Sequence, residues 1–227
     1  VIWERDWPVF NPETGKVEWS YEGPKSLSET FYPKENKFDD FDDQKLPMYM
    51  VFWGTPAKDC WKIEDSCLKL KCIRQRLDDD LEQMKMDGIL ADDKYVAFVS
   101  RRQCAMDAVI TAAVKFYPEG QESAGIAAVQ AMNHQIHIER ACEDGKQVVR
   151  VVVITADYIQ PPYFPGFTST TNREIICSEA YDKSEIILQL DMQHEDFCIR
   201  YGESEEELKE LCRIDGAVIN PEKVGCM

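Results

Sequence analysis

The chain has 227 residues, 44% of them hydrophobic and 30% charged, which is typical of a folded globular protein with a full hydrophobic core. Its formal net charge is −16, so a nucleic-acid backbone or an anionic membrane would repel it, and neither is expected as a partner. No stretch has the length and apolar character of a membrane span.

The cysteine content favours free thiols. Nine cysteines without regular spacing argue against a disulfide framework, and the sequence has no Asn-X-Ser/Thr glycosylation signal. Both observations predict a cytoplasmic or nuclear protein. The chain begins at Val1, so a fragment of a longer protein, or a form that has lost a signal peptide, is the alternative.

The sequence of residues 1–45 predicts an extended aromatic arm that lies on a protein surface. Residues 11–15, Asn-Pro-Glu-Thr-Gly, have the composition of a tight turn, so residues 8–10 and 16–19 are expected to pair as a hairpin. A second copy of the chain is one expected partner for this arm. Residues 46–227 are expected to form a single domain.

The elements predicted for this domain follow from hydrophobic periodicity and from turn residues. They are a strand at 46–53, helices at 63–87, 101–116 and 124–142 with a strand at 94–100, and strands at 146–158, 174–177, 184–192 and 197–201. A short helix is then expected to begin at Ser204, where Ser204 and Glu207 form a capping box, and to end at Gly216.

The strand at 146–158 is the centre of this prediction. Its run Val151–Ile154 has no polar interruption, which is typical of a strand buried on both faces. The mixture of elements predicts an α+β fold, with helices packed on one side of a mixed, mainly antiparallel sheet. A doubly wound α/β sheet is the alternative.

A stiff aromatic loop follows the central strand and is the predicted binding site. Ligands often bind beyond strand ends, and prolines pre-organise a loop for binding. The binding residues predicted here are Tyr158, Pro161, Pro162, Tyr163, Phe164 and Phe167.

Catalytic motifs are scarce. The sequence has no Gly-rich phosphate loop and no GxSxG elbow. Cys60, ahead of the helix predicted at 63–87, is a candidate nucleophile with His137 or His194 as its base. On a helix, His134 and His137 would lie on one side and could share a metal ion.

Two weaker constellations remain. Cys177, His194 and Cys198 are candidate soft metal ligands, although the chain has no CxxC pair. The carboxylates of Glu185, Asp191 and Asp196 could face one another across strands, as in metal-dependent nucleases.

The sequence therefore predicts a non-catalytic, intracellular interaction module without a cofactor, which binds a basic protein or a peptide through its aromatic loop and arm. An enzyme that uses Cys60 with a histidine base, or a metal at His134 and His137, is the alternative.

Overall fold

The computed structural model describes residues 2–16, 38–43, 45–79, 96–158 and 169–220. The chain divides into two compact units, Val1–Asp39 and Asp40–Met227. Among the described residues, no helix is long and apolar enough to span a membrane.

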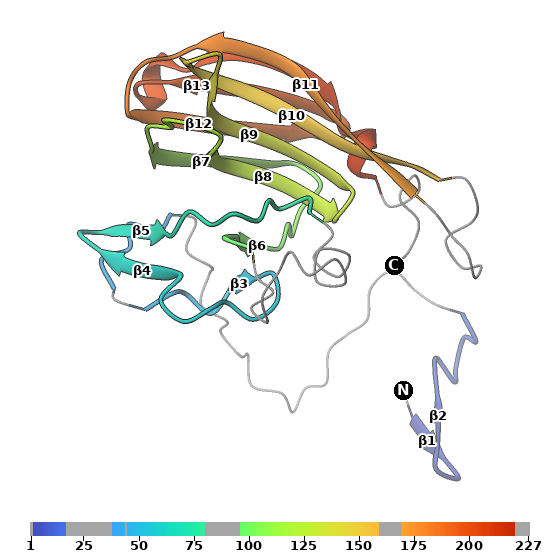
Figure 1. Ribbon diagram of the computed structural model, residues 1–227. Coiled ribbons are helices and arrows are strands. Elements are labelled where there is room, and N and C mark those ends of the chain that lie inside the picture. The colour runs from blue at the N-terminus through green and yellow to red at the C-terminus, as the bar shows by residue number, and fades with distance from the viewer. Residues whose placement is uncertain (1, 17–37, 44, 80–95, 159–168, 221–227) are drawn as a thin grey trace. The chain divides into compact units, whose positions relative to one another are not determined.

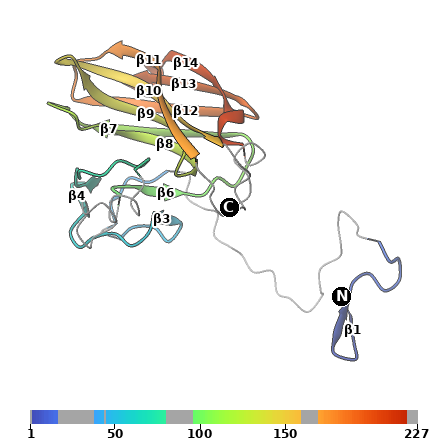
Figure 2. The same cartoon turned by 45° about the vertical axis from the view of Figure 1, so that its right-hand side comes forward.

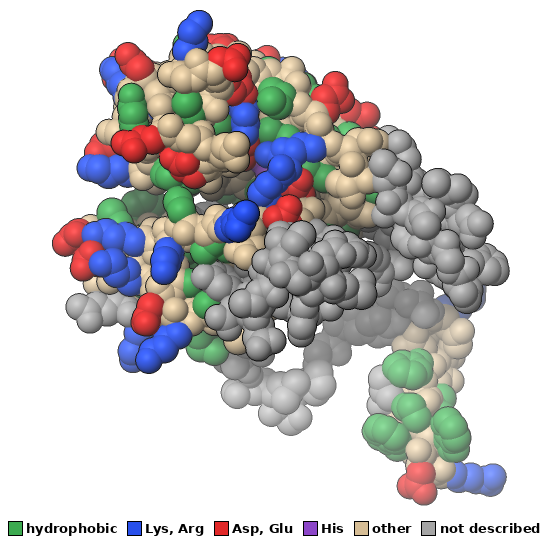
Figure 3. All heavy atoms as spheres, in the orientation of Figure 1, with side chains coloured by type: hydrophobic (Ala, Val, Ile, Leu, Met, Phe, Trp, Pro, Cys, Tyr) green, Lys and Arg blue, Asp and Glu red, His purple; other side chains and the backbone are tan. Residues whose placement is uncertain are grey.

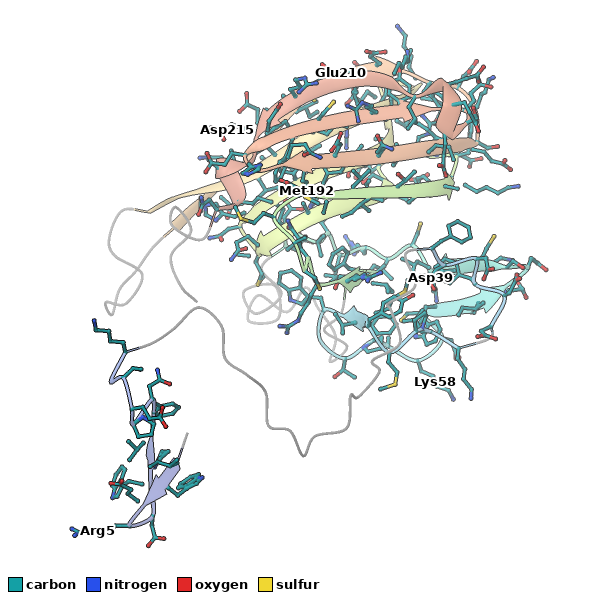
Figure 4. The ribbon with its side chains drawn as sticks, turned by 180° about the vertical axis from the view of Figure 1, so that it is seen from behind. Arg5, Asp39, Lys58, Met192, Glu210 and Asp215 are labelled. Atoms are coloured by element: carbon teal, nitrogen blue, oxygen red, sulfur yellow. The ribbon has the colours of Figure 1, made fainter. Side chains whose placement is uncertain are left out.

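Two four-stranded antiparallel sheets form the body of the second unit (Figures 1 and 2). The first sheet, in the order β11-β10-β9-β8, is made of β8 (Ala124–Ala131), β9 (His134–Glu143), β10 (Lys146–Tyr158) and β11 (Ser169–Ala180). The second sheet, in the order β14-β13-β12-β7, is made of β7 (Ala108–Lys115), β12 (Glu185–Gln193), β13 (Asp196–Gly202) and β14 (Lys209–Asp215). Figure 4 shows the second sheet from its outer side, with Glu210 and Asp215 on β14.

The core lies between the two sheets and follows the period-two alternation of strand side chains. Every second residue of β9, β10, β12 and β13 points into it. The buried cluster consists of Ile136, Ile138, Val149, Val151, Val153, Ile186, Leu188, Leu190, Met192, Phe197, Ile199 and Tyr201. Burial of this many large apolar side chains is the main stabilising contribution to the sandwich.

The central strand β10 is buried on both of its faces. Val151 and Val153 point into the core, whereas Val152 and Ile154 point to the outer face of the first sheet and are nonetheless fully buried. The predicted strand at 146–158 is thus confirmed. The burial of Val152 and Ile154 also shows that part of this outer face is covered.

Shorter elements complete the described residues. They are β1 (Ile2–Glu4) and β2 (Trp7–Val9), which pair in the first unit, and in the second unit β3 (Met50–Phe52) with β6 (Val99–Arg101), β4 (Trp61–Glu64) with β5 (Cys67–Leu70), and the 3-10 turns η1 (Glu205–Glu207) and η2 (Gly216–Ile219).

The predicted α+β fold is wrong, and so is the α/β alternative, because the described residues form antiparallel sheets and only short 3-10 turns. The helix predicted at 124–142 is the hairpin of β8 and β9, and the helix predicted at 101–116 contains β7. The described part of the helix predicted at 63–87 contains the end of β4 and all of β5. Val, Ile and Thr in these segments favour a pleated strand.

Two-residue turns explain why these segments fold as hairpins. Asp144 and Gly145, between β9 and β10, have φ angles of 50° and 76°. Asp65 and Ser66, between β4 and β5, have φ angles of 54° and 53°. Two successive positive φ angles are the signature of a type I′ turn, whose twist matches that of paired strands. Asp144-Gly145 is thus a hairpin turn and not the end of a helix.

The predictions near the two ends of the chain have mixed outcomes. The turn at 11–15 is present, since Asn11 O accepts hydrogen bonds from the amides of Thr14 and Gly15, but most of the second strand expected after it lies outside the described residues. The helix expected at Ser204 is only the 3-10 turn η1, and the Ser204 side chain makes no capping hydrogen bond. The strands predicted at 174–177, 184–192 and 197–201 lie in β11, β12 and β13.

Candidate functional site

A buried carboxylate lies on the outer face of the first sheet. Glu139 of β9 is 6% exposed. Arg150, opposite it on β10, donates to Oε1 from Nε at 2.9 Å and from Nη2 at 2.7 Å. Ser123 Oγ donates to the second carboxylate oxygen, Oε2, at 2.9 Å. Both oxygens of Glu139 are therefore held in a fixed orientation.

A second carboxylate reaches the same place from the segment between β5 and β6. Arg173 of β11 bridges the two acids, with Nη1 at 3.1 Å from Asp78 Oδ1 and Nη2 at 3.3 Å from Glu139 Oε1. Arg76 Nη2 lies 2.7 Å from Asp78 Oδ2. Burial alone would raise the pKa of Asp78, but the hydrogen bond from Arg76 and the charge of Arg173 outweigh it and hold this pKa below its usual value.

We call these five residues (Arg76, Asp78, Glu139, Arg150 and Arg173) the Arg–carboxylate cluster. Figure 3 shows basic and acidic side chains close together over the first sheet. The Arg76 side chain is 52% exposed and that of Arg173 is 24% exposed, whereas both carboxylates are buried. The guanidinium groups of Arg76 and Arg173 are therefore open to solvent, whereas the carboxylates that they pair with are buried.

His137 lies beside this cluster and is uncharged at neutral pH. Its Nε2 is 2.6 Å from Gln135 Oε1, and its Nδ1 is 4.0 Å from Glu139 Oε2. Burial lowers the pKa of His137 to about 4, although the nearby charge of Glu139 opposes this change. Gln135 in turn donates to Leu77 O at 3.3 Å, so the segment that contains Asp78 lies against this face of the sheet.

The two histidines predicted as metal ligands are separated. Both lie on β9, where a step of three residues places side chains on opposite faces. His134 Nδ1 is 3.1 Å from Asn133 Oδ1, away from the partners of His137. Within the described ranges, no group of three or more His, Cys, Asp or Glu residues is placed to hold a metal ion.

Cys60 does not have the surroundings expected of a nucleophile. It is 4% exposed and precedes the strand β4, so the helix that was expected to follow it is replaced by a strand. His137 hydrogen-bonds Gln135, and His194 Nδ1 is 3.0 Å from Asp107 Oδ1. The described residues show no hydrogen bond between Cys60 and either histidine.

The other predicted constellations are not brought together as ligand sets. Each of the three carboxylates has its own basic partner: Glu185 with Lys115, Asp191 with Arg200, and Asp196 with Arg213. Cys198 donates instead to Glu210 Oε2 at 3.3 Å.

The predicted aromatic binding site mostly lies outside the described residues. Tyr158 is the last residue of β10, and Pro161, Pro162, Tyr163, Phe164 and Phe167 follow in the part of the chain that is not described.

The Arg–carboxylate cluster was missed because β9 was predicted as a helix. On a strand, Gln135, His137 and Glu139 share one face, while Ile136 and Ile138 share the other. When both faces of such a strand are buried, the apolar face packs against the hydrophobic core and the polar face lines a buried polar site. That alternation is visible in residues 134–140, HQIHIER.

Comparison with known families decides what kind of domain this is. The model of the Beta xylosidase C-terminal Concanavalin A-like domain matches residues 38–225. The chain belongs to this family. No curated protein matches the chain.

Solved structures share the fold of this Concanavalin A-like domain. A GH43_12 protein from a capybara gut metagenome is 19% identical with a TM-score of 0.73, and the match covers 99% of this chain and 40% of that one. GH43B of a Bacteroides ovatus xyloglucan locus is 20% identical with a TM-score of 0.71, at the same coverage of 99% and 40%. Xylan beta-1,4-xylosidase from Bacillus halodurans is 16% identical with a TM-score of 0.67, over 87% of this chain and 34% of that one. The present chain thus spans well under half of these solved chains.

The family corrects the function predicted from the sequence. The predicted protein- or peptide-interaction module, and the alternative enzyme based on Cys60 or on His134 and His137, are both replaced by a C-terminal β-sandwich domain of the GH43 glycoside hydrolase type. The expected protein or peptide partner, the expected pairing of arms between two copies, and the cytoplasmic or nuclear location stay predictions.

Proposed function

We propose that this domain is a non-catalytic, carbohydrate-binding part of a GH43-type glycoside hydrolase, with its binding surface at the Arg–carboxylate cluster. The observation that supports this proposal most strongly is the family match over residues 38–225. The printed names of the related solved proteins include a xylan beta-1,4-xylosidase and a xyloglucan-locus protein. Xylose-containing polysaccharides are therefore the ligands that we propose.

The chemistry of the cluster suits sugar recognition. The oxygen of a sugar hydroxyl accepts hydrogen bonds, and the cluster offers the exposed guanidinium donors of Arg76 and Arg173. Arg173 is fixed by two carboxylates and Arg76 by Asp78, so little side-chain entropy is lost when a ligand binds. The net charge of −16 does not oppose binding of a neutral polysaccharide.

The same ion pairs favour binding over catalysis. Glycoside hydrolysis uses two carboxyl groups, one of which has a raised pKa and donates a proton to the leaving group. The pKa of Asp78 is instead held low by Arg76 and Arg173. Both oxygens of Glu139 are engaged by Arg150, Arg173 and Ser123, which leaves neither carboxylate of the cluster placed as a free general acid. We therefore assign hydrolysis to a part of the longer protein outside this domain.

The test is affinity gel electrophoresis of the purified chain in gels that contain soluble xylan or xyloglucan. We expect at least one of these polysaccharides to retard the chain. Arg76→Ala should weaken this binding about tenfold, because it removes an exposed charged donor.

Arg213→Ala is the matched control. The Arg213 side chain is 51% exposed and is ion-paired with Asp196 and Glu210 on the second sheet. Its exposure equals that of Arg76 to within one percentage point, so a general effect of lost charge would appear in both variants. Mobility that no polysaccharide changes would contradict carbohydrate binding. Equal weakening by both substitutions would contradict the assigned surface.

A further inference from the structure

Two cysteines face one another across the edge where the sheets of the sandwich meet. Cys177 lies on β11, an edge strand of the first sheet, and Cys212 lies on β14, an edge strand of the second. These strands approach to within 8 Å between Cα atoms. Glu179 of β11 also accepts hydrogen bonds from Lys209 of β14 at 3.0 Å and from Tyr201 at 2.5 Å, so polar contacts already join the sheets close to the cysteines.

The register of the strands directs both thiols inward. Cys177 pairs with Val151 and Cys212 pairs with Ile199, and both partners are core residues. The two cysteines themselves pack against this core. Because residues directly opposite each other in a sheet point to the same face, both sulfur atoms lie on the inner side of their sheets.

A β-bulge lies next to each cysteine. In β11, Val151 pairs with Cys177 but Val152 pairs with Ile175, so Ile176 is the extra residue. In β14, Ile199 pairs with Cys212 but Arg200 pairs with Glu210, so Leu211 is the extra residue. A bulge bends its strand and re-aims the neighbouring side chains. Here the two bulges lie at the same edge, where the neighbouring Cys212 thiol lowers the pKa of Cys177.

We propose that Cys177 and Cys212 are a paired modification site, where oxidation forms a disulfide that joins the two sheets. This inference is independent of carbohydrate binding. It depends on the approach of the two edge strands and on the inward register of both cysteines, because a disulfide needs two cysteines on neighbouring strands whose side chains point to the same space. The expectation of free thiols throughout the chain came from sequence spacing, which has no information about contacts between strands.

The reaction balances with a small disulfide, such as oxidised glutathione, as the oxidant. The Cys177 thiolate attacks one sulfur of glutathione disulfide, which forms a mixed disulfide and releases one reduced glutathione. The Cys212 thiol then loses its proton and attacks the Cys177 sulfur, which releases the second glutathione. The hydrogen bond from Cys212 lowers the pKa of Cys177 and so favours the attacking thiolate, while burial opposes this.

Peptide mapping tests the proposal. The native chain is equilibrated with oxidised glutathione, alkylated, and digested with trypsin without reduction. The expected product is a disulfide between the peptides of residues 174–183 and 210–213, which contain one cysteine each. Reduction should separate them. The melting temperature of the oxidised chain should exceed that of the reduced chain by on the order of 5 to 10 °C.

Cys198→Ser is the matched control. Cys198 lies on β13, next to the strand of Cys212, but it pairs with Arg213 and donates to Glu210 on the outer face. The control variant should keep the linked peptides and the thermal shift, whereas Cys177→Ser should lose both. The proposal would be overturned if both peptides were recovered only in alkylated form, or if Cys177 were linked to another cysteine. Both results are obtained with the wild-type chain, so they do not depend on whether a variant folds.

Discussion

At the scale of single residues, the outer face of the first sheet combines a neutral histidine with buried ion pairs. His137 is surrounded by Glu139 on its own strand, Arg173 on β11, and Arg76 and Asp78 on the segment that lies against the sheet. The charges of these two carboxylates and two guanidinium groups nearly cancel, so burial decides the protonation state of His137. Because the folded chain binds a proton at His137 only near pH 4, this residue makes stability depend on pH.

The sign of this dependence follows from the two pKa values. Unfolded histidine titrates near ~6.5, whereas folded His137 titrates at about 4. Between these values the unfolded chain binds a proton that the folded chain does not, so the free energy of unfolding falls as the pH falls. The contribution of His137 should be a loss of about 2 kcal/mol between pH 7.5 and pH 5.

Urea unfolding of the wild type and of His137→Gln at both pH values measures this loss. The glutamine can still donate to Gln135 but does not titrate, so the variant should lose about 2 kcal/mol less than the wild type over this interval. His194→Gln, at an exposed side chain whose Nδ1 lies 3.0 Å from Asp107 Oδ1, is the comparison for a histidine substitution outside this face of the sheet. Equal pH dependence in the wild type and His137→Gln would contradict a neutral, buried His137.

At the scale of elements, the sequence predicted the strands with a clear apolar pattern and misassigned those with a weak one. Strand β10 has a continuous Val and Ile run, and β12 alternates between apolar and polar residues, so both were identified. In β8, small residues gave no clear period of two, and in β9 the alternation of residues 134–140 was interpreted as part of a helix. The Asp144-Gly145 turn was the strongest available signal for a hairpin, and its φ angles of 50° and 76° show that it should have decided the assignment.

Gly125 tests the pairing of β8 with β9. This residue lies opposite Glu139, and a Cβ atom there would overlap the Ile138 carbonyl oxygen and come within 2.8 Å of Glu139 Cα. The backbone cannot move away as a flexible side chain could. Gly125→Ala should therefore lower the free energy of unfolding by more than about 2 kcal/mol, as overpacking in a rigid site does.

Gly120→Ala is the comparison for this substitution. A Cβ atom at Gly120 would meet only the end of the Glu122 side chain, at 3.1 Å, so the free energy of unfolding should change by less than about 0.5 kcal/mol. Chemical denaturation of both variants measures the difference. A Gly125→Ala chain as stable as the Gly120→Ala chain would show that β8 is not packed against β9 in the described register.

At the scale of the whole molecule, composition indicated a globular protein but could not distinguish a sandwich from an α+β fold. The two sheets are held together by residues far apart in sequence, such as Ile136 on β9 and Met192 on β12, and local periodicity has no information about such pairs. The functional prediction depended on the absence of catalytic motifs from the sequence. That absence does not distinguish an interaction module from a domain that accompanies a catalytic domain. The family match supplied what composition and periodicity could not.

The central claim is that the outer face of the first sheet binds carbohydrate, and a nuclear magnetic resonance titration tests it most directly. Two-dimensional ¹⁵N–¹H spectra of the chain are recorded with increasing xylohexaose. We predict saturable shifts of the backbone amides of Gln135, His137, Glu139, Arg150 and Arg173. A spectrum that xylohexaose leaves unchanged, or shifts confined to β7, β12, β13 and β14, would contradict the claim.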